Sequence, residues 1–301
     1  MSVAELEARD VQLEVGPGGG LWSDAWRRLR RNPAALIGFA LVMIFVLTAI
    51  FAPLIAPHGP REQLGLANSF DGPSREHLLG LDELARDEFS RIVYGARFSL
   101  IIGVVSVSVG LSIGILLGAA AGYLGGWVDT LIMRSMDVML SIPGFLMAIG
   151  IVALLRPGLW QIMIAVGVTQ IPIFARLLRG SVLAQRENDF VLAARAVGVP
   201  RRTILASHIL PNAISPVIVQ GTLALATAII DVAGLGFLGL GPQDPATPEW
   251  GTMLSGVNRY FQTGPHLALA PGFAIVISVL GFNLIGDGLR EALDPKLRGR
   301  A

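Results

Sequence analysis

The chain has 301 residues, of which 53% are hydrophobic and only 15% are charged, and its formal net charge is +1. So few charged side chains could not cover the surface of a soluble globule of this length, so the composition predicts a membrane protein. The absence of cysteine excludes disulfides, thiolate zinc sites and cysteine nucleophiles, and the near-neutral charge gives no case for a nucleic-acid partner.

Six apolar runs are each long enough to cross a hydrocarbon core about 30 Å thick, so we predict an all-α integral membrane protein with six transmembrane helices. Segments on the same side of the predicted membrane as the N-terminus hold 16 of the 23 basic residues. This excess predicts that both termini are cytoplasmic. The predicted spans cover residues 34–56, 99–121, 131–155, 159–176, 212–234 and 267–286.

The tails and loops differ in composition. Residues 1–33 form a predicted cytoplasmic tail, whose arginines between Arg27 and Arg31 lie just before the first span. The length of this lead and of the apolar run favours a membrane anchor over a secretory signal peptide. Residues 57–98 are the longest outer loop, and five arginines there are offset by seven acidic residues, which predicts a folded cap. The remaining residues form two predicted regions. A core of five transmembrane helices covers 99–290 and includes a cytoplasmic loop at 177–211, and a cytoplasmic C-terminal tail covers 291–301.

The second predicted span carries small residues at a strict four-residue spacing, which places them on one face of a helix. Small side chains let two helix backbones approach closely, so we predict that another helix packs against this face. That helix belongs either to this chain or to a second subunit, and the pattern alone leaves both alternatives open. The residues are Ser106, Gly110, Gly114, Gly118 and Gly122.

Known catalytic and metal-binding patterns are missing from the sequence. The four histidines form no HExxH and no other two-histidine ligand spacing, and there is no GxSxG. The single lysine, Lys296, lies between Pro295 and Leu297, so it cannot complete a P-loop. A membrane-embedded enzyme would need a nucleophile and a base within hydrogen-bond reach, and a stand-alone secondary carrier or channel would need a midplane ion site. The polar groups in or near the predicted spans are Asp137, Gln170, Gln220, Asp231, Asn283 and Asp287.

The cytoplasmic loop from Arg176 to Asn212 is the most informative stretch, because it carries six arginines and is far longer than a turn. We predict that Asp189 caps a short helix over 190–197 and that Gly198 ends it in a left-handed conformation. A second short helix is predicted over 201–210, with Ile204, Leu205 and Ile209 on one face. Two rigid helices joined at a glycine could act as a lever for a cytoplasmic partner, whereas an inert connector is the alternative.

Five ordered segments resemble a known family of transporters. Residues 193–198, followed by 208–212, resemble the EAA loop of binding-protein-dependent ABC importer permeases, in the form used by the dipeptide and oligopeptide group. The spacing from Gly198 to Leu210 and Pro211 agrees with that motif. The other stretches that resemble this group are 30–33 before the first span, 77–97 in the outer loop, 236–254 after the fifth span and 283–295 at the C-terminus.

This resemblance implies the type I permease fold of ABC importers in the cytoplasmic (inner) membrane, and a subunit that is not an enzyme and binds no cofactor. It implies transport of di- or oligopeptides by alternating access, with ATP and Mg²⁺ used by partner subunits. The implied partners are a homologous second permease in a heterodimer, two ATPase subunits, an extracytoplasmic substrate-binding protein and membrane lipid. Relatives of this group also carry nickel chelates, glutathione or oligosaccharides, so the cargo stays open. The implied ATPase-docking residues are Asp189, Phe190, Val191, Leu192, Ala193, Ala194, Arg195, Ala196, Val197, Gly198, Val199, Pro200, Leu210 and Pro211.

Four positions depart from the family pattern. Leu192 stands in place of the motif's Glu, Leu81 in place of a usual Thr, Ala85 in place of a usual Gly, and Gly236 in place of a usual Ser. Any polar contact made by the family Glu cannot be carried over to Leu192, although we still expect docking. We place Ala194 on the docking face, so a charge introduced there should uncouple ATP hydrolysis from uptake while membrane insertion stays intact.

Overall fold

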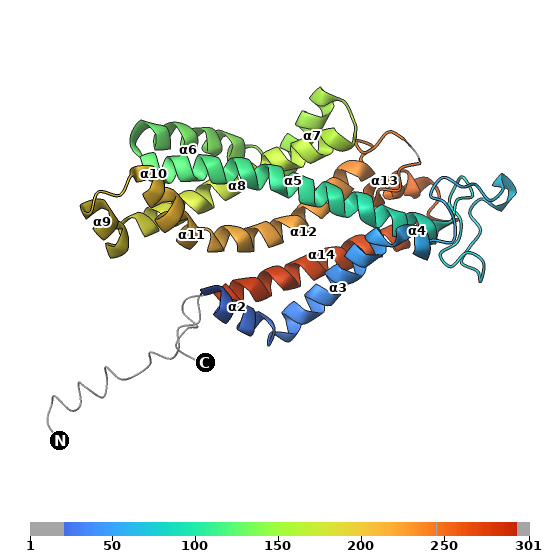
Figure 1. Cartoon of the computed structure of the whole chain (residues 1–301). Coiled ribbons are helices and arrows are strands. Elements are labelled where there is room, and N and C mark those ends of the chain that lie inside the picture. Colours follow the sequence, from blue (N-terminus) through green and yellow to red (C-terminus); the bar gives the residue numbers. More distant parts are fainter. Residues whose placement is uncertain (1–20, 245, 294–301) are drawn as a thin grey trace, which may run out of the picture.

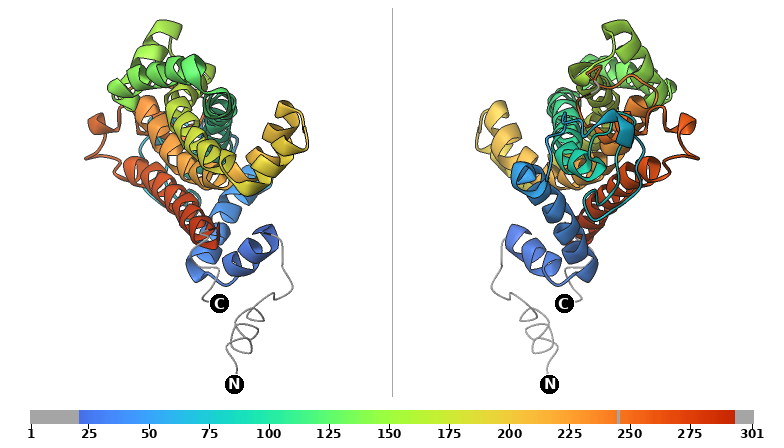
Figure 2. Two further views of the ribbon diagram at one scale, coloured as in Figure 1. Left: turned by 90° about the vertical axis from the view of Figure 1, so that its left-hand side faces the viewer. Right: turned by 90° about the vertical axis from the view of Figure 1, so that its right-hand side faces the viewer.

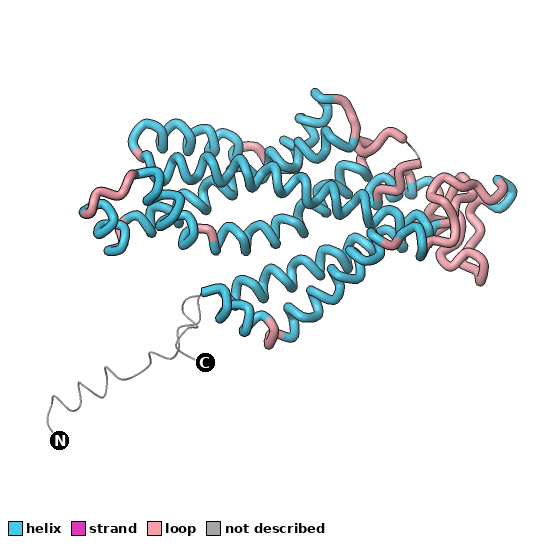
Figure 3. Tube along the Cα trace, in the orientation of Figure 1, coloured by secondary structure: helices cyan, strands magenta, loops and turns pink. Residues whose placement is uncertain are grey.

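The structure is a computed structural model, and it describes residues 21–244 and 246–293. Long helices run side by side along one direction, with loops gathered at one end (Figures 1 and 3). The short helices α9 (Asp189–Ala196) and α10 (Arg201–Thr203) lie at the other end. Within the described residues, the only β pairing is a single bridge between Leu81 and Asp87. The predicted all-α fold is therefore confirmed.

The first membrane helix, α3, lies at the periphery against the last long helix, α14 (His266–Leu293) (Figure 2). It follows the short helix α2 (Leu21–Leu29) and runs over Pro33–Ile50. Asn32 starts it, because the Asn32 side chain accepts a hydrogen bond from the backbone N–H of Ala35 and Pro33 fits the first helical position. The surface of α3 that does not contact α14 is mostly exposed and apolar, as a lipid-facing helix requires. A four-residue helix, α4 (Ala52–Ile55), continues it.

Helices α5 (Glu88–Leu124) and α8 (Leu159–Arg186) form the central pair of the bundle. The stripe of small residues on α5 faces α8 in this chain. A Cβ on Gly114 would lie 2.5 Å from Phe174 Cβ, and one on Gly118 would lie 2.5 Å from the carbonyl oxygen of Ala175. The backbones approach so closely that only glycine fits. Of the two alternatives that the sequence left open, packing within this chain or against a second subunit, the structure shows the first.

A sharp bend divides the region predicted as the third span. Helix α6 (Gly126–Ser141) and helix α7 (Gly144–Leu155) meet at 91°. Ile142 is extended because it precedes Pro143, and Pro143 has no N–H to continue the helix. The described residues therefore contain five helices that are long and apolar enough to span a membrane, or six when the bent pair counts as one span.

Helices α12 (Ser215–Phe237) and α14 (His266–Leu293) complete the bundle, close to the fifth and sixth predicted spans. The main core joins α5, α7, α8 and α12 around large buried side chains such as Phe174, Ile162 and Leu178. This core continues into the cytoplasmic loop, so the loop is packed on the membrane helices. Three short helices belong to the outer loops: η1 (Leu66–Asn68), α13 (Trp250–Leu254) and η3 (Val257–Arg259).

Candidate functional site: a cytoplasmic helical loop and an outer pocket

The cytoplasmic loop begins with helix α9 (Asp189–Ala196), which follows the end of α8 after two residues. Its N-cap is Asn188, so the helix starts one residue earlier than we predicted and the proposed cap by Asp189 is wrong. Asp189 instead lies in the first turn, where a negative charge interacts favourably with the helix dipole. The predicted left-handed end is confirmed, since Gly198 has φ +81° and its N–H donates to the carbonyl of Arg195.

The second half of the loop is helical, as predicted, but it is wound unevenly. It runs through α10 (Arg201–Thr203), the π-helical turn η2 (Ile204–Ile209) and α11 (Leu210–Ala213). The wider winding ends where Pro211 cannot supply an N–H to the helical pattern. Ile204 and Ile209 are buried in the main core, which confirms their predicted position on one apolar face.

The orientation of α9 corrects one prediction. Ala194 is only 7% exposed and, like Val191, it belongs to the main core, so it faces this chain rather than a docking partner. A charge at Ala194 would therefore disturb folding, and our sequence-based test at that position was misplaced. Of the other predicted docking residues, Val199 and Leu210 are half-buried, and the exposed ones are Asp189, Phe190, Leu192, Ala193, Arg195, Ala196, Val197, Gly198, Pro200 and Pro211.

Two contacts tie the loop to the inner end of α5. The hydroxyl of Tyr123 donates a hydrogen bond of 2.9 Å to the carbonyl of Arg201, and Arg186 donates to the carbonyl of Gly122. With the buried residues Val191 and Ala194, these contacts make the loop a rigid extension of three membrane helices, α5, α8 and α12. A displacement of α9 would therefore be transmitted to those helices.

At the outer end, the loop stretch 77–97 is organised around one buried carboxylate, that of Asp82. Arg86 Nε donates to Asp82 Oδ2 at 2.6 Å, and Arg91 Nε lies 3.4 Å from the same oxygen. Asp82 Oδ1 accepts from the backbone N–H groups of Leu84 and Arg86. Ala85, within this turn, has φ +55°, a conformation that favours glycine. The usual Gly of the family pattern would relieve a strain of roughly 1–2 kcal/mol there.

The same stretch contacts the start of α13 and the residues just before it. Trp250 Nε1 donates to the carbonyl of Ile92 at 3.1 Å, and a Cβ on Gly95 would lie 2.4 Å from the carbonyl oxygen of Pro248. Arg97 donates to the carbonyls of Ala49 and Ile50 at the end of α3. Residues 77–97 therefore hold α3, α5 and the loop that connects α12 to α14 together.

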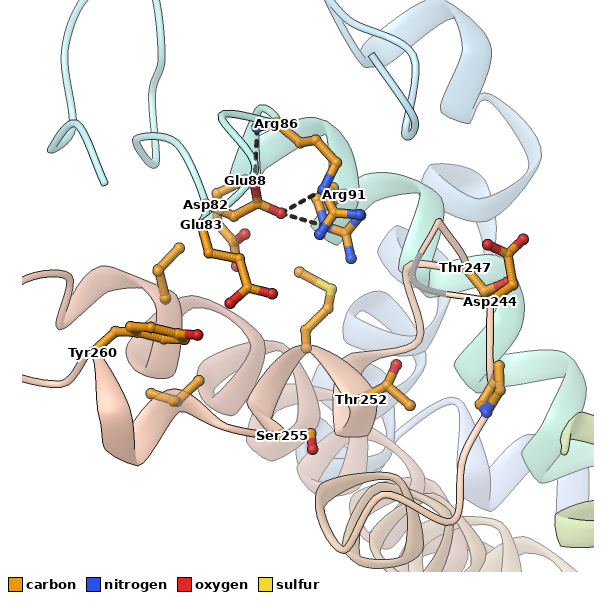
Figure 4. Close-up of a pocket in the computed structure, with 14 residues that line it drawn as sticks. Asp82, Glu83, Arg86, Glu88, Arg91, Asp244, Thr247, Thr252, Ser255 and Tyr260 are labelled. Atoms are coloured by element: carbon orange, nitrogen blue, oxygen red, sulfur yellow. Dashed lines mark hydrogen bonds and ion pairs between the residues drawn. The ribbon is translucent and has the colours of Figure 1, made fainter. Parts of the chain in front are cut away.

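A pocket of about 120 Å³ lies between residues 82–91 and 242–260. Figure 4 shows Asp82, Glu83, Glu88 and the two arginines on one wall, opposite Tyr260, Ser255 and Thr252. Sequence reasoning missed this site, because its acidic residues look like surface charges of a cap. The exceptional group is Glu88, which is 2% exposed, and its Oε1 has no hydrogen-bond partner among the described residues.

Glu249 stabilises the floor of this outer region. Its two carboxyl oxygens accept hydrogen bonds of 2.8 Å from the backbone N–H groups of Gly251 and Thr252, which caps α13. Burial nevertheless raises the pKa of the Glu249 carboxyl to about 7, since the loss of water outweighs the hydrogen bonds to the charged form.

Polar residues in the inner half of the bundle are partly accounted for by ion pairs. Asp137 on α6 pairs with Arg176 on α8, and Asp129 pairs with Arg179 through two contacts, one of them 2.6 Å long. Among the described residues, no group of three or more acidic or histidine side chains could hold a metal ion.

Comparisons with known proteins agree with this geometry. Residues 114–299 match the family model of the binding-protein-dependent transport system inner membrane component, and residues 20–73 match the N-terminal transmembrane domain of oligopeptide transport permease C. A dipeptide transport system permease protein of Alkalihalophilus pseudofirmus is 48% identical over 277 residues, covering 92% of this chain and 90% of the relative. A glutathione transport system permease protein of Escherichia coli is 46% identical over 278 residues, covering 92% and 91%.

A solved structure shares the fold. An inward-facing methionine ABC transporter contains a chain that aligns with a TM-score of 0.55 at 20% identity, over 68% of this chain and 96% of that one.

Proposed function

This chain belongs to the family of binding-protein-dependent transport system inner membrane components, and from that premise we propose which cargo and which assembly it serves. It is a multi-pass permease subunit of an ABC importer in the inner membrane, and it is not itself catalytic. Membership of this family implies ATPase and binding-protein partners. We propose that its cargo is a di- or oligopeptide. Support comes from the dipeptide and glutathione permeases that resemble it over nine-tenths of its length, because both cargoes are short peptides.

We further propose that the chain pairs with a homologous second permease and that two ATPases serve the pair, one of them docking on α9. The observation that carries this proposal is a group of exposed apolar side chains on α9 and at its C-terminal end. Phe190 and Leu192 on the helix are exposed, and Val197, which follows its last residue, is 79% exposed. A helix that presents apolar side chains beyond the inner end of the membrane core needs a protein partner to cover them.

The geometry of the loop supports coupling by alternating access. Closure of the ATPases on ATP would move α9, and the buried anchor of Val191 and Ala194 would carry that movement to α8 and α12. Hydrolysis and reopening would reset the helices. Such coupling requires that the ATPase states differ in affinity for the two membrane conformations, since a partner that binds both equally shifts neither.

Reconstitution tests the proposal. We would purify the tagged chain from its native membrane, identify its companions by mass spectrometry and measure uptake of labelled alanyl-alanine and glutathione into liposomes. The proposal expects a second permease, ATPases and uptake that requires hydrolysable ATP. Uptake by the chain alone without ATP would contradict it and would indicate a secondary carrier or channel. Uptake of glutathione without alanyl-alanine would narrow the cargo to that tripeptide.

A further inference from the structure

The outer pocket has more acidic than basic groups. Four carboxyl groups line it, from Asp82, Glu83, Glu88 and Asp244, against the guanidinium groups of Arg86 and Arg91. Two of the four carboxyl groups have ion-pair partners. Asp82 holds both arginines, and Asp244 pairs with Arg61 at 2.8 Å, whereas Glu83 is an exposed side chain at the mouth of the pocket.

Glu88 is different. It starts helix α5, lines the pocket beside Asp82 and Glu83 (Figure 4), and keeps one buried carboxyl oxygen without a partner among the described residues. A buried oxygen left without a hydrogen bond costs roughly 1–3 kcal/mol, so such groups call for a specific explanation. With Arg61 counted beside Arg86 and Arg91, three guanidinium groups offset three of the four carboxyl groups. The remaining carboxyl group and the free acceptor of Glu88 both favour a donor that carries positive charge.

The volume of the pocket restricts the size of that donor. Pockets that enclose a whole small ligand have volumes of roughly 300–1,000 Å³, whereas this one measures about 120 Å³. A di- or tripeptide does not fit, but one ammonium group on a short aliphatic stem does. Met253, Val257 and Leu267 supply apolar wall for such a stem.

We propose that this pocket receives a lysine side chain presented by the substrate-binding protein, with Glu88 Oε1 accepting from its ammonium group. The inference rests on the proposed function, which supplies a binding protein at the outer face. A lysine seated there would contact both the start of α5 and the segment between α12 and α14. Docking of the binding protein would thus act on α5 and α12, which also form the core that packs against α9.

The test uses the assembled transporter in lipid nanodiscs and the binding protein that co-purifies with it. The quantity measured is the concentration of binding protein that gives half-maximal stimulation of ATP hydrolysis. We expect Glu88→Gln to raise this concentration about tenfold, and Ser255→Tyr, which fills the pocket while all four carboxyl side chains remain in the sequence, to do the same. Glu76→Gln is the matched control, because Glu76 is an exposed acid of the same loop outside the pocket. It should change nothing.

A small probe identifies the chemistry independently of any substitution. Butylammonium chloride should compete with the binding protein on the wild-type complex, whereas potassium chloride at equal ionic strength should not. Equal effects of the two salts, or an unchanged half-maximal concentration in Ser255→Tyr, would overturn the proposal even if Glu88→Gln failed to assemble.

Two further outcomes separate the alternatives. If the Glu88→Gln effect is lost when the binding protein is loaded with an N-acetylated peptide, the ammonium group comes from the cargo and the lysine assignment is wrong. If the wild-type complex shows no stimulation by any co-purified binding protein, the proposed function itself fails, which is distinct from a failure confined to the pocket variants.

Discussion

The close contact between α5 and α8 yields a paired prediction. Gly118→Ala would place a Cβ 2.5 Å from the carbonyl oxygen of Ala175, about 0.9 Å inside the 3.4 Å at which ordinary contact begins. The obstacle is a backbone atom, so no side-chain rotation can relieve the overlap and the two helices must separate. Gly180→Ala on α8 is the matched control, since no atom of the described residues lies within 4 Å of its added Cβ.

The magnitude follows from two opposing terms. Both substitutions gain roughly 1 kcal/mol of helix propensity, because alanine restricts the unfolded chain more than glycine. Overpacking against a backbone atom costs about 3 kcal/mol, the upper end of the usual range. We therefore expect Gly118→Ala to destabilise the chain by about 2 kcal/mol and Gly180→Ala to stabilise it by about 1 kcal/mol.

Equilibrium unfolding of the two variants in mixed detergent micelles, titrated with dodecyl sulfate, measures this difference. Helix propensity cancels between the variants, so their separation of about 3 kcal/mol isolates the packing term. If Gly118→Ala proved as stable as Gly180→Ala, the small-residue stripe would not be the contact that holds α5 against α8, and the reasoning would be refuted.

Three more predictions concern the loop and the outer region. Val197→Asp should leave folding intact but lower ATP-coupled uptake, whereas Ala194→Asp should reduce the yield of folded chain, because it buries a charge. Uptake assays and size-exclusion profiles distinguish the two variants. A well-folded Ala194→Asp variant would contradict the packing of α9. Gly198→Ala should lower the stability of the loop by roughly 1–2 kcal/mol, because φ is +81° there, and Gly198→Asn should have a milder effect. The alanine variant should also bind the ATPase more weakly, which co-purification measures. Recovery of as much ATPase with the alanine variant as with the wild type would show that the left-handed turn is not needed for docking. Burial raises the pKa of Glu249 to about 7 from 4.5, so the neutral form favours folding. The contribution of this group to stability should be fully present below pH 4.5 and fall by about 3 kcal/mol as the pH rises to 7. Glu249→Gln should abolish that pH dependence in unfolding titrations, and an unchanged slope would show that another group titrates.

The sequence predicted the features that depend on local chemistry. The approximate positions of the spans, the left-handed Gly198 and the packing stripe on α5 all follow from apolar length, glycine placement and periodicity, although α5, α8 and α14 extend well beyond the predicted spans. It could not predict which face of α9 is buried, because Ala194 and its exposed neighbours are equally small. It also missed the 91° bend at Pro143, since both halves of that run are apolar enough to be read as one span.

The outer pocket could not have been found from sequence for a different reason. Its walls are separated by about 160 residues along the chain, and the acidic residues are balanced by arginines within the same loop. Only the fold shows that Asp82 takes both arginines and leaves Glu88 with an unpaired oxygen.

The packing of α3 on α14 sets an order for the synthesis of this protein. Gly38 meets Leu284, and Ala35 meets Gly288, so the first membrane helix has its main partner in the last one. At roughly 5–20 residues per second, a ribosome takes about 10–50 s to make the intervening stretch. During that time α3 lacks its main partner and has only its smaller contact with α5, which its almost wholly apolar surface permits in lipid. The first membrane helix to be inserted is therefore among the last to complete its main packing contact.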